Sequence, residues 1–269
     1  MTGGATPEPR EFAVLAADIA REAGDMLRQK RSARPEVVQT KSSPTDVVTA
    51  LDRAAEELVR DRIRTARPGD AVLGEEGGAT GGGDVRWIVD PIDGTVNFLY
   101  GLPEWAVSVA VEVAGTVVAG AVNVVPRGEL FTAWLGGGAW LGGERLRCNT
   151  GVPLSRALIA TGFGYSAARR VVQAEVLAGV LPVVRDIRRS GSAAADLCSV
   201  AAGRVDGYYE RGTEYWDHAA GGLVAAEAGA RVGGLNGRPH NPDMTLAAAP
   251  GLFEELHDLL VTLDPERDA

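Results

Sequence analysis

The chain has 269 residues, of which 45% are hydrophobic and 23% charged, and its formal net charge is −9. This length allows one large domain or two modest ones with a sizeable core. The acidic balance argues against a nucleic-acid-binding surface, which is normally basic. The N-terminus lacks a signal-peptide pattern and no run of about 18 apolar residues occurs, so we expect a cytoplasmic protein without a membrane span.

The N-terminal part reads as a short tail followed by two helices. Residues 1–9 are rich in Gly, Thr and Pro, and we expect them to be disordered. Apolar residues recur at helical spacing over 12–27 and again over 47–63. The segment Pro68-Gly69-Asp70 ends the second pattern. Each of these helices is expected to bury one face.

Extended segments dominate the middle of the chain. Trp87-Ile88-Val89 predicts a buried strand, which Pro91 cannot continue because it lacks a backbone N–H. Three further extended runs over 105–113, 116–125 and 129–134 are separated by turns. They predict an antiparallel meander beside the first strand.

Strand-like and helical segments alternate in the second half. Strands are predicted at 157–163, 186–189, 206–209 and 245–249. Helices are predicted at 167–184, where Pro182 ends or kinks the helix, and at 193–202, 216–228 and 252–263. We therefore divide the chain into the tail 1–9, an N-terminal α+β half over 10–152 and a C-terminal α/β half over 153–269.

The turn after the first buried strand carries two carboxylates, Asp90 and Asp93. Two carboxylates this close repel, and both stay ionised only if a cation lies between them. Two solvated Asp side chains in a turn are the alternative. Further acids follow a short strand at Glu75-Glu76 and begin a helical segment at Asp217, so three acidic clusters could converge on one centre. Hard divalent ions such as Mg²⁺ take oxygen ligands and share them with substrate phosphates, so we predict a phosphoryl-transfer site.

The size of the catalytic task favours metal chemistry at such a site. Hydrolysis of a phosphate monoester needs ~20 kcal/mol or more of barrier reduction. A single general acid or base accelerates a reaction only about 10²–10⁴-fold. A pair of metal ions can activate water, neutralise the phosphoryl charge and stabilise the leaving group.

These segments resemble the signatures of the inositol monophosphatase family. Asp90-Pro91-Ile92-Asp93-Gly94-Thr95, followed by Asn97-Phe98 and Gly101-x-Pro103, resembles the first signature, and Trp216-Asp217-x-Ala219-Ala220-Gly221 resembles the second. Gly74-Glu75-Glu76 resembles the family's metal-binding Glu segment. Lys41-Ser42-Ser43-Pro44-Thr45-Asp46, with Thr49 and Asp52, matches a further segment. The resemblance implies an α+β fold, a layered α-β-α-β-α sandwich with the active site between its halves, and a homodimer.

The resemblance also implies a metal centre of two or three Mg²⁺ ions, for which Mn²⁺ is a possible substitute. Glu75, Asp90 and the backbone carbonyl of Ile92 would hold the first ion. Asp90 would bridge to a second ion, which Asp93 and Asp217 complete, and Glu75 would reach a looser third ion through water. Glu76 is only an accessory candidate, because in a strand its side chain points to the opposite face from Glu75.

Catalytic roles follow from the same resemblance. Glu75 and Thr95 would orient the attacking water, and Asp52 would fix the Thr95 hydroxyl; an exposed helical acid is the alternative for Asp52. Asp46 is either a helix N-cap or an indirect contributor to the metal site. Lys41 either lies near the site entrance or is a solvated surface lysine.

Substrate contacts are predicted from two further segments. Gly191-Ser192-Ala193 resembles the family's loop that meets the sugar or inositol ring, with the Ala193 N–H as donor. Glu210 matches the position that binds polyol hydroxyls, and a carboxylate suits two adjacent hydroxyls; an ordinary strand-end Glu is the alternative. Arg188 and Arg189 either help with a second anionic group or are solvated, and Glu214 has no assigned role. The remaining predicted substrate contacts are Asp93, Gly94, Thr95 and Asp217.

The sequence thus predicts a Mg²⁺-dependent, lithium-sensitive phosphomonoesterase that hydrolyses myo-inositol 1-phosphate by metal-activated water. One alternative is a phosphatase of the same superfamily for fructose 1,6-bisphosphate, histidinol phosphate or a 3′-phosphonucleotide. An alternative of another class is a regulatory binding protein that retains the fold. The expected partner is a small-molecule phosphate monoester, with neither nucleic acid nor membrane.

Overall fold

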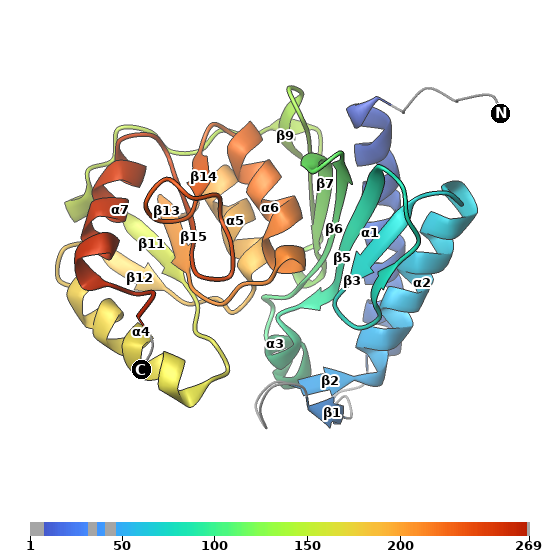
Figure 1. Cartoon of the computed structure of the whole chain (residues 1–269), viewed down its shortest axis with the longest axis horizontal. Coiled ribbons are helices and arrows are strands. Elements are labelled where there is room, and N and C mark those ends of the chain that lie inside the picture. The colour runs from blue at the N-terminus through green and yellow to red at the C-terminus, as the bar shows by residue number, and fades with distance from the viewer. Residues whose placement is uncertain (1–7, 32–36, 41–46, 268–269) are drawn as a thin grey trace.

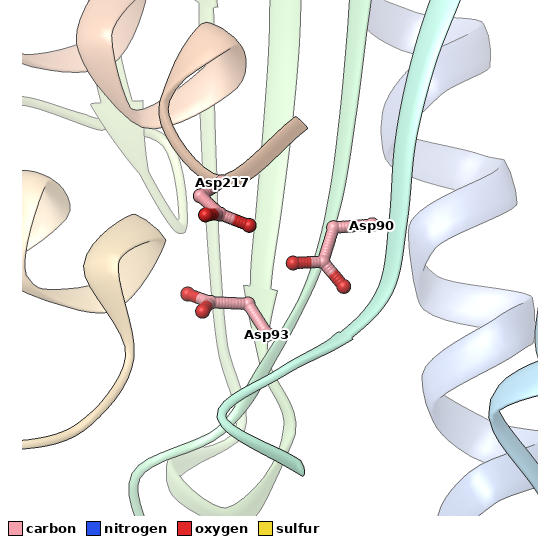
Figure 2. A group of neighbouring side chains, drawn as sticks. All are labelled: Asp90, Asp93 and Asp217. Carbon is pink, nitrogen blue, oxygen red and sulfur yellow. The ribbon is translucent and has the colours of Figure 1, made fainter. Parts of the chain in front are cut away.

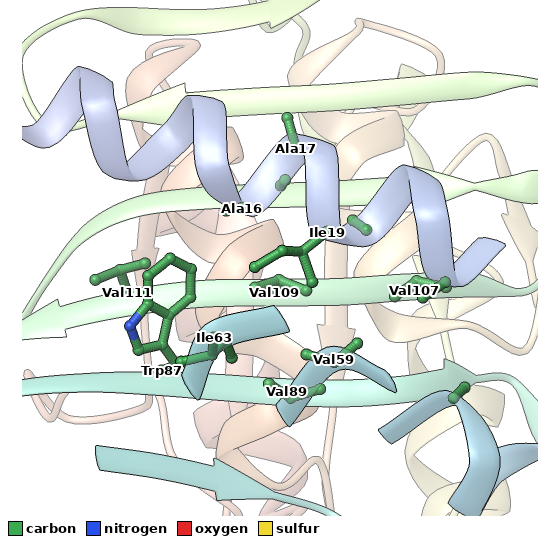
Figure 3. Close-up of a cluster of buried hydrophobic side chains, with 14 of the residues drawn as sticks. Ala16, Ala17, Ile19, Val59, Ile63, Trp87, Val89, Val107, Val109 and Val111 are labelled. Carbon is green, nitrogen blue, oxygen red and sulfur yellow. The ribbon is translucent and has the colours of Figure 1, made fainter. Parts of the chain in front are cut away.

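Two long helices cover one face of a large sheet. The computed structural model describes residues 8–31, 37–40 and 47–267, and in it α1 (Pro9–Lys30) and α2 (Ala50–Ala66) form the outer layer on one side (Figure 1). Their apolar stripes meet the sheet: Ile19 of α1 and Val59 of α2 lie over a row of buried side chains that includes Trp87 (Figure 3). This burial explains the helical spacing seen in the sequence.

The sheet beneath these helices has eight strands in the order β10-β9-β8-β7-β6-β5-β3-β4. The predicted meander is confirmed, because β5 to β10 pair antiparallel in chain order. Only β3 runs parallel to β5. The strands are β3 (Ala71–Gly74), β4 (Gly78–Thr80), β5 (Val85–Asp93), β6 (Ala106–Val113), β7 (Thr116–Val124), β8 (Glu129–Trp134), β9 (Gly138–Leu141) and β10 (Glu144–Arg145).

The middle layer consists of α5 (Ala193–Ala201) and α6 (Tyr215–Glu227), which lie between two sheets (Figure 1). Both helices are rich in Ala and Gly and are buried on nearly all sides. Small side chains let α6 approach closely: a Cβ at Gly120 of β7 would lie 3.1 Å from Ala220 Cα. A helix that is apolar all round is expected where both of its faces are covered.

A five-stranded sheet in the order β12-β11-β13-β15-β14 and two outer helices complete the molecule. These elements are β11 (Leu158–Thr161), β12 (Asp186–Arg188), β13 (Gly207–Glu210), β14 (Arg231–Gly233) and β15 (Thr245–Ala248), with α4 (Ala167–Val180) and α7 (Leu252–Leu263) outside. The order of layers is therefore α-β-α-β-α, which confirms the predicted fold class (Figure 1).

Three sequence predictions about element boundaries need correction. The helix predicted from residue 47 begins at Ala50, because Val47–Thr49 forms strand β2 against β1 (Val37–Thr40) and Thr49 is the N-cap in place of Asp46. β5 continues through Pro91 to Asp93, with a register shift between Asp90 and Asp93 that accommodates the proline. α4 ends at Val180, before Pro182 is reached.

Some predictions fall outside what the structure tests. Lys41 and Asp46 lie outside the described residues, as do residues 1–7 of the predicted tail, while α1 already begins at Pro9. The division of the chain at residue 152 stays a prediction. Within the described part of the chain, no helix combines the length and the apolar character needed to cross a bilayer.

Candidate active site

A cleft of about 600 Å³ opens where the two sheets and the middle helices meet. Its walls come from the end of β5, the beginning of α3 (Thr95–Tyr100), the loop before α5, the end of β13, the beginning of α6 and the loop before α4. Most predicted site residues meet here, although they are far apart in sequence. Those lining the cleft are Glu75, Asp90, Ile92, Asp93, Gly94, Thr95, Gly191, Ala193, Glu210 and Asp217.

Three carboxylates converge on one point of this cleft. One oxygen from each of Asp90, Asp93 and Asp217 lies within 4.8 Å of the others (Figure 2). Asp90 and Asp93 stand on the last residues of β5, and Asp217 stands on the first turn of α6. Because β5 and α6 belong to different layers, the cluster exists only where the layers pack together.

Each of these carboxylates is oriented by a protein donor. Ile92 N donates to Asp90 Oδ1 at 3.0 Å. Ser192 Oγ and Ala194 N donate to Asp93 Oδ2 at 2.6 and 2.7 Å. The backbone N of Glu214 donates to Asp217 Oδ2 at 2.7 Å, which gives Glu214 a structural role through its main chain.

The electrostatics of the cluster favour a bound cation. Burial, followed by the charges of Glu75, Asp93 and Asp217, raises the pKa of Asp90 well above its usual range. Burial also raises the pKa of Asp93 to about 6, against the opposing hydrogen bonds from Ser192 and Ala194. The pKa of Asp217 is raised by burial and then by Asp93. A buried, mutually repelling set of oxygen donors fits a hard divalent cation, which would let all three ionise.

Glu75 lies on the cleft wall beside Asp90 and follows directly after β3. Its backbone N donates to Val89 O at 3.2 Å, which ties this segment to β5. Glu76 does not line the cleft. Its backbone N instead donates to Glu56 Oε2 at 2.7 Å. The structure thus places Glu75, and not Glu76, at the site.

Glu56 is a site-supporting residue that the sequence analysis missed. It is a buried acid on α2 that also accepts from Gly77 N at 2.8 Å and from Arg60 Nε at 2.7 Å. A Cβ at Gly74 would lie 2.4 Å from the Glu56 carboxyl carbon, so Gly74 gives this side chain its room. The i, i+4 spacing of Glu56 and Arg60 was the one available signal, and it is typical of ordinary surface pairs.

Thr95 and Asp52 form the predicted pair. Thr95 Oγ1 lies 3.2 Å from Asp52 Oδ1 and 3.0 Å from Ile92 O. Asp52 is buried, so it is not an exposed helical acid. Its Oδ2 accepts from Thr49 N at 2.8 Å and from the Thr49 hydroxyl, in a capping box. Burial raises the pKa of Asp52 to about 6, although the two bonds from Thr49 act against this rise.

We expect Asp52→Ala to lower the free energy of unfolding by about 2 kcal/mol, because it removes the helix cap and leaves the Thr49 and Thr95 hydroxyls without this acceptor. Urea unfolding of the metal-free protein measures this loss. Asp61→Ala, at an exposed acid of the same helix, is the control. A loss below about 0.5 kcal/mol, the usual range of surface substitutions, would contradict the capping role.

The substrate end of the cleft contains Glu210 at the end of β13. Tyr208 Oη donates to Glu210 Oε2 at 2.9 Å. Burial raises the pKa of Glu210 to about 7. Gly191 and Ala193 line the cleft as predicted, whereas Ser192 does not: its hydroxyl donates to Asp93 and accepts from Ala195 N at 3.3 Å.

The far wall of the cleft comes from the loop that follows β11 and from the first turn of α4. No sequence motif marked this wall. Trp216, which precedes Asp217 in α6, also lines the cleft. The residues of the far wall are Phe163, Gly164, Tyr165, Ser166 and Arg169.

The layered fold and its buried, all-oxygen acidic cluster define a protein of the metal-dependent phosphatase type. The sequence profile of the inositol monophosphatase family matches residues 8–263. The chain therefore belongs to the inositol monophosphatase family.

Relatives of known name support this assignment over nearly the full chain. The inositol-1-monophosphatase SuhB of Mycobacterium tuberculosis is 49% identical over 269 residues, covering 93% of both chains. A protein named Nus factor SuhB in Escherichia coli is 38% identical, covering 91% of this chain and 97% of its own. The structure of the Thermotoga maritima IMPase superposes with a TM-score of 0.86 at 31% identity, covering 95% of this chain and 99% of its own.

Proposed function

We propose that this protein is a Mg²⁺-dependent phosphomonoesterase that hydrolyses myo-inositol 1-phosphate to myo-inositol and phosphate. The observation that carries the proposal is the convergence of Asp90, Asp93 and Asp217 in a cleft that also contains Glu210. The acidic end suits metal ions and a phosphate, and Glu210 suits the hydroxyls of a polyol. The relatives named inositol-1-monophosphatase give the proposal its substrate.

In this proposal, Glu75, Asp90, Asp93, Asp217 and the Ile92 carbonyl hold two or three Mg²⁺ ions, with Mn²⁺ as a possible substitute. When bound, the ions neutralise the phosphoryl charge and lower the pKa of water. The ligand set brings one charge from each of four carboxylates, which offsets most of the charge of two or three divalent ions. The carboxylate orientations set by Ser192, Ala194 and Glu214 reduce the reorganisation that binding requires.

The protein's own groups position the reactants. Thr95 Oγ1 accepts a hydrogen bond from the attacking water while it donates its own proton to Asp52 Oδ1, and Glu75 holds the same water from the other side. Gly94 and Thr95 line the cleft directly after Asp93. In this proposal their backbone N–H groups bind the phosphate. The Ala193 N–H and the Glu210 carboxylate contact the polyol. Lys41 and Asp46 stay accessory candidates.

We expect Glu210→Ala to raise KM for inositol 1-phosphate about tenfold, since a hydrogen bond to a charged group contributes ~1.5–3 kcal/mol. An aryl phosphate lacks the polyol hydroxyls, so its KM should change less than about twofold. Steady-state kinetics on both substrates measure the difference, with Glu144→Ala, an exposed acid on β10, as the control. If KM changed equally for both substrates, Glu210 would have no role in polyol recognition.

The raised pKa of Glu210 predicts a pH dependence of polyol binding. The carboxylate form, which accepts two hydrogen bonds, increases as pH rises through about 7. KM for inositol 1-phosphate, divided by KM for an aryl phosphate, should therefore fall between pH 6 and pH 8. The division cancels the titration of protein groups that act on both substrates. Glu210→Gln should lose this fall and keep only the change that comes from the different phosphate pKa values of the two substrates, and a wild-type ratio that follows the Glu210→Gln ratio would refute the prediction.

Phosphate release across a substrate panel tests the proposed function itself. The panel contains inositol 1-phosphate, fructose 1,6-bisphosphate, histidinol phosphate and a 3′-phosphonucleotide, each with and without Mg²⁺. A Mg²⁺-dependent preference for inositol 1-phosphate of about tenfold in kcat/KM, or ~1.4 kcal/mol, supports the proposal. If another substrate of the panel is hydrolysed faster, the proposed substrate is wrong, whereas the proposed metal site still holds.

The second candidate function is a regulatory binding role. The relative named Nus factor SuhB favours it, because that name describes no enzyme. If no substrate of the panel is hydrolysed, the regulatory role would be favoured over the enzymatic one. Lithium inhibition and a homodimer stay predictions, checked by adding Li⁺ to the same assay and by light scattering.

A further inference from the structure

Asn97 belongs to the first signature segment, yet it is neither a proposed metal ligand nor a residue of the cleft wall. It lies on α3, two positions after Thr95, and is 3% exposed. A buried side-chain amide needs an acceptor for each of its two N–H bonds. The positions of these acceptors therefore show which parts of the molecule the residue holds together.

The two acceptors of Asn97 belong to segments that are far apart in sequence. Asn97 Nδ2 donates to Glu104 O at 2.6 Å and to Ser190 O at 2.8 Å. Glu104 lies in the loop after α3, whereas Ser190 lies in the loop before α5, directly before Gly191. One amide group thus joins α3 to the loop whose residues Gly191 and Ala193 line the cleft.

Glycines allow these segments to approach so closely. A Cβ at Gly191 would lie 2.8 Å from Asn97 Nδ2, and a Cβ at Gly94 would lie 3.0 Å from Gly191 O. Gly94 and Gly191 also have φ angles of 91° and 96°, which other residues rarely adopt. The turn after Asp93 and the loop before α5 therefore meet through bare backbone.

A second link between the same segments runs through a proposed metal ligand. Ser192 Oγ and Ala194 N donate to Asp93 Oδ2 at 2.6 and 2.7 Å. This link orients Asp93, whereas the bond from Asn97 holds the backbone at Ser190. The two links share no atom, so a change at Asn97 can loosen the loop while Asp93 keeps both of its donors.

We propose that Asn97 is a positioning residue for substrate recognition: it fixes the loop that carries Gly191 and the Ala193 N–H, and so sets how well the site binds the polyol. The inference rests on the proposed phosphatase function and deepens it, because it identifies a specificity determinant outside the cleft. Both N–H bonds of the amide are used by carbonyl oxygens. A carboxylate of the same size cannot replace the amide, since acceptors would then face acceptors.

The test measures steady-state kinetics and backbone hydrogen exchange for Asn97→Ala and Asn97→Asp. Asn97→Ala removes both donors without adding a buried charge. Each variant should raise KM for inositol 1-phosphate about tenfold and KM for an aryl phosphate less than about twofold, since the aryl phosphate has no polyol for the loop to bind. The backbone amides of residues 190–193 should exchange faster than in the wild type. The rise in Tm on addition of Mg²⁺ should be retained, because no proposed metal ligand is altered.

Asn123→Asp is the matched control. Asn123 is a buried residue of β7 whose Nδ2 donates to Ala20 O at 3.0 Å, and it does not line the cleft. This variant also places a carboxylate against a carbonyl oxygen, so it should lower Tm. It should leave KM for both substrates and the exchange of residues 190–193 unchanged.

The outcomes separate this inference from the proposed function. If the wild type hydrolyses neither substrate in Mg²⁺, the proposed function fails, and the exchange of residues 190–193 alone decides whether Asn97 holds the loop. Unchanged exchange in both Asn97 variants would overturn the inference. So would an equal rise in KM for both substrates, or loss of the Mg²⁺-dependent rise in Tm, because Asn97 would then act on the shared phosphate or on the metal ligands. A rise in KM confined to inositol 1-phosphate, together with faster exchange, supports it.

Discussion

We expect Asp93→Asn to lower kcat/KM for a phosphate monoester by about a thousandfold or more, which corresponds to ~4 kcal/mol of transition-state stabilisation. The amide oxygen can still accept from Ser192 Oγ and Ala194 N, so the packing of this residue against α5 is retained. What is lost is one negative charge of the cluster formed with Asp90 and Asp217. The variant should therefore fold and fail to hold its metal ions.

Two measurements separate these effects. Thermal unfolding without metal should show an unchanged or slightly higher Tm, because one of three mutually repelling charges is gone. Addition of Mg²⁺ should raise the Tm of the wild type and not of the variant. Asp84→Asn, at an exposed acid in the loop before β5, is the control and should behave as wild type. Near wild-type turnover by Asp93→Asn would refute the metal assignment.

The second large effect is expected from Glu56→Ala, which should lower the free energy of unfolding by ~3–5 kcal/mol. The change leaves Arg60, whose side chain is 13% exposed, without its acidic partner. It also removes the acceptor for the N–H groups of Glu76 and Gly77. Because these groups hold the turn that carries Glu75, activity should fall together with stability.

Urea unfolding at constant m-value checks the stability loss. Glu57→Ala alters the neighbouring exposed glutamate of the same helix and should cost less than about 0.5 kcal/mol. Glu56→Gln keeps an acceptor oxygen, so its free energy of unfolding should lie between those of Glu56→Ala and Glu57→Ala. If Glu56→Ala were as stable as Glu57→Ala, the turn around Glu75 would have to be held by other contacts.

Local signals predicted much of the fold and of the acidic cluster. The carboxylates at Asp90, Asp93 and Asp217 follow or begin regular elements, so their neighbours in sequence also set their positions in space. Helical spacing located α1, and α7 matches its predicted bounds. These features depend on residues within one or two turns of each other.

Features that depend on distant partners were missed. Glu56 reads as a surface acid until Gly74 and Gly77 pack against it, and Arg169 reads as a helix-surface arginine until the cleft forms around it. The short strands β9, β10 and β14 are defined by their pairing partners more than by their own residues. The beginning of α2 could have been found, because Thr49 and Asp52 have capping-box spacing.

The position of Asp93 has a consequence for how the molecule is made. Its side chain accepts bonds from residues 99 and 101 positions later, and its companion Asp217 comes later still. A ribosome therefore completes α1, α2 and the eight-stranded sheet before the last of the three acids exists. We infer that the proposed metal binding is among the final events of biogenesis. Free metal would then stabilise the folded protein without guiding the folding of the nascent chain.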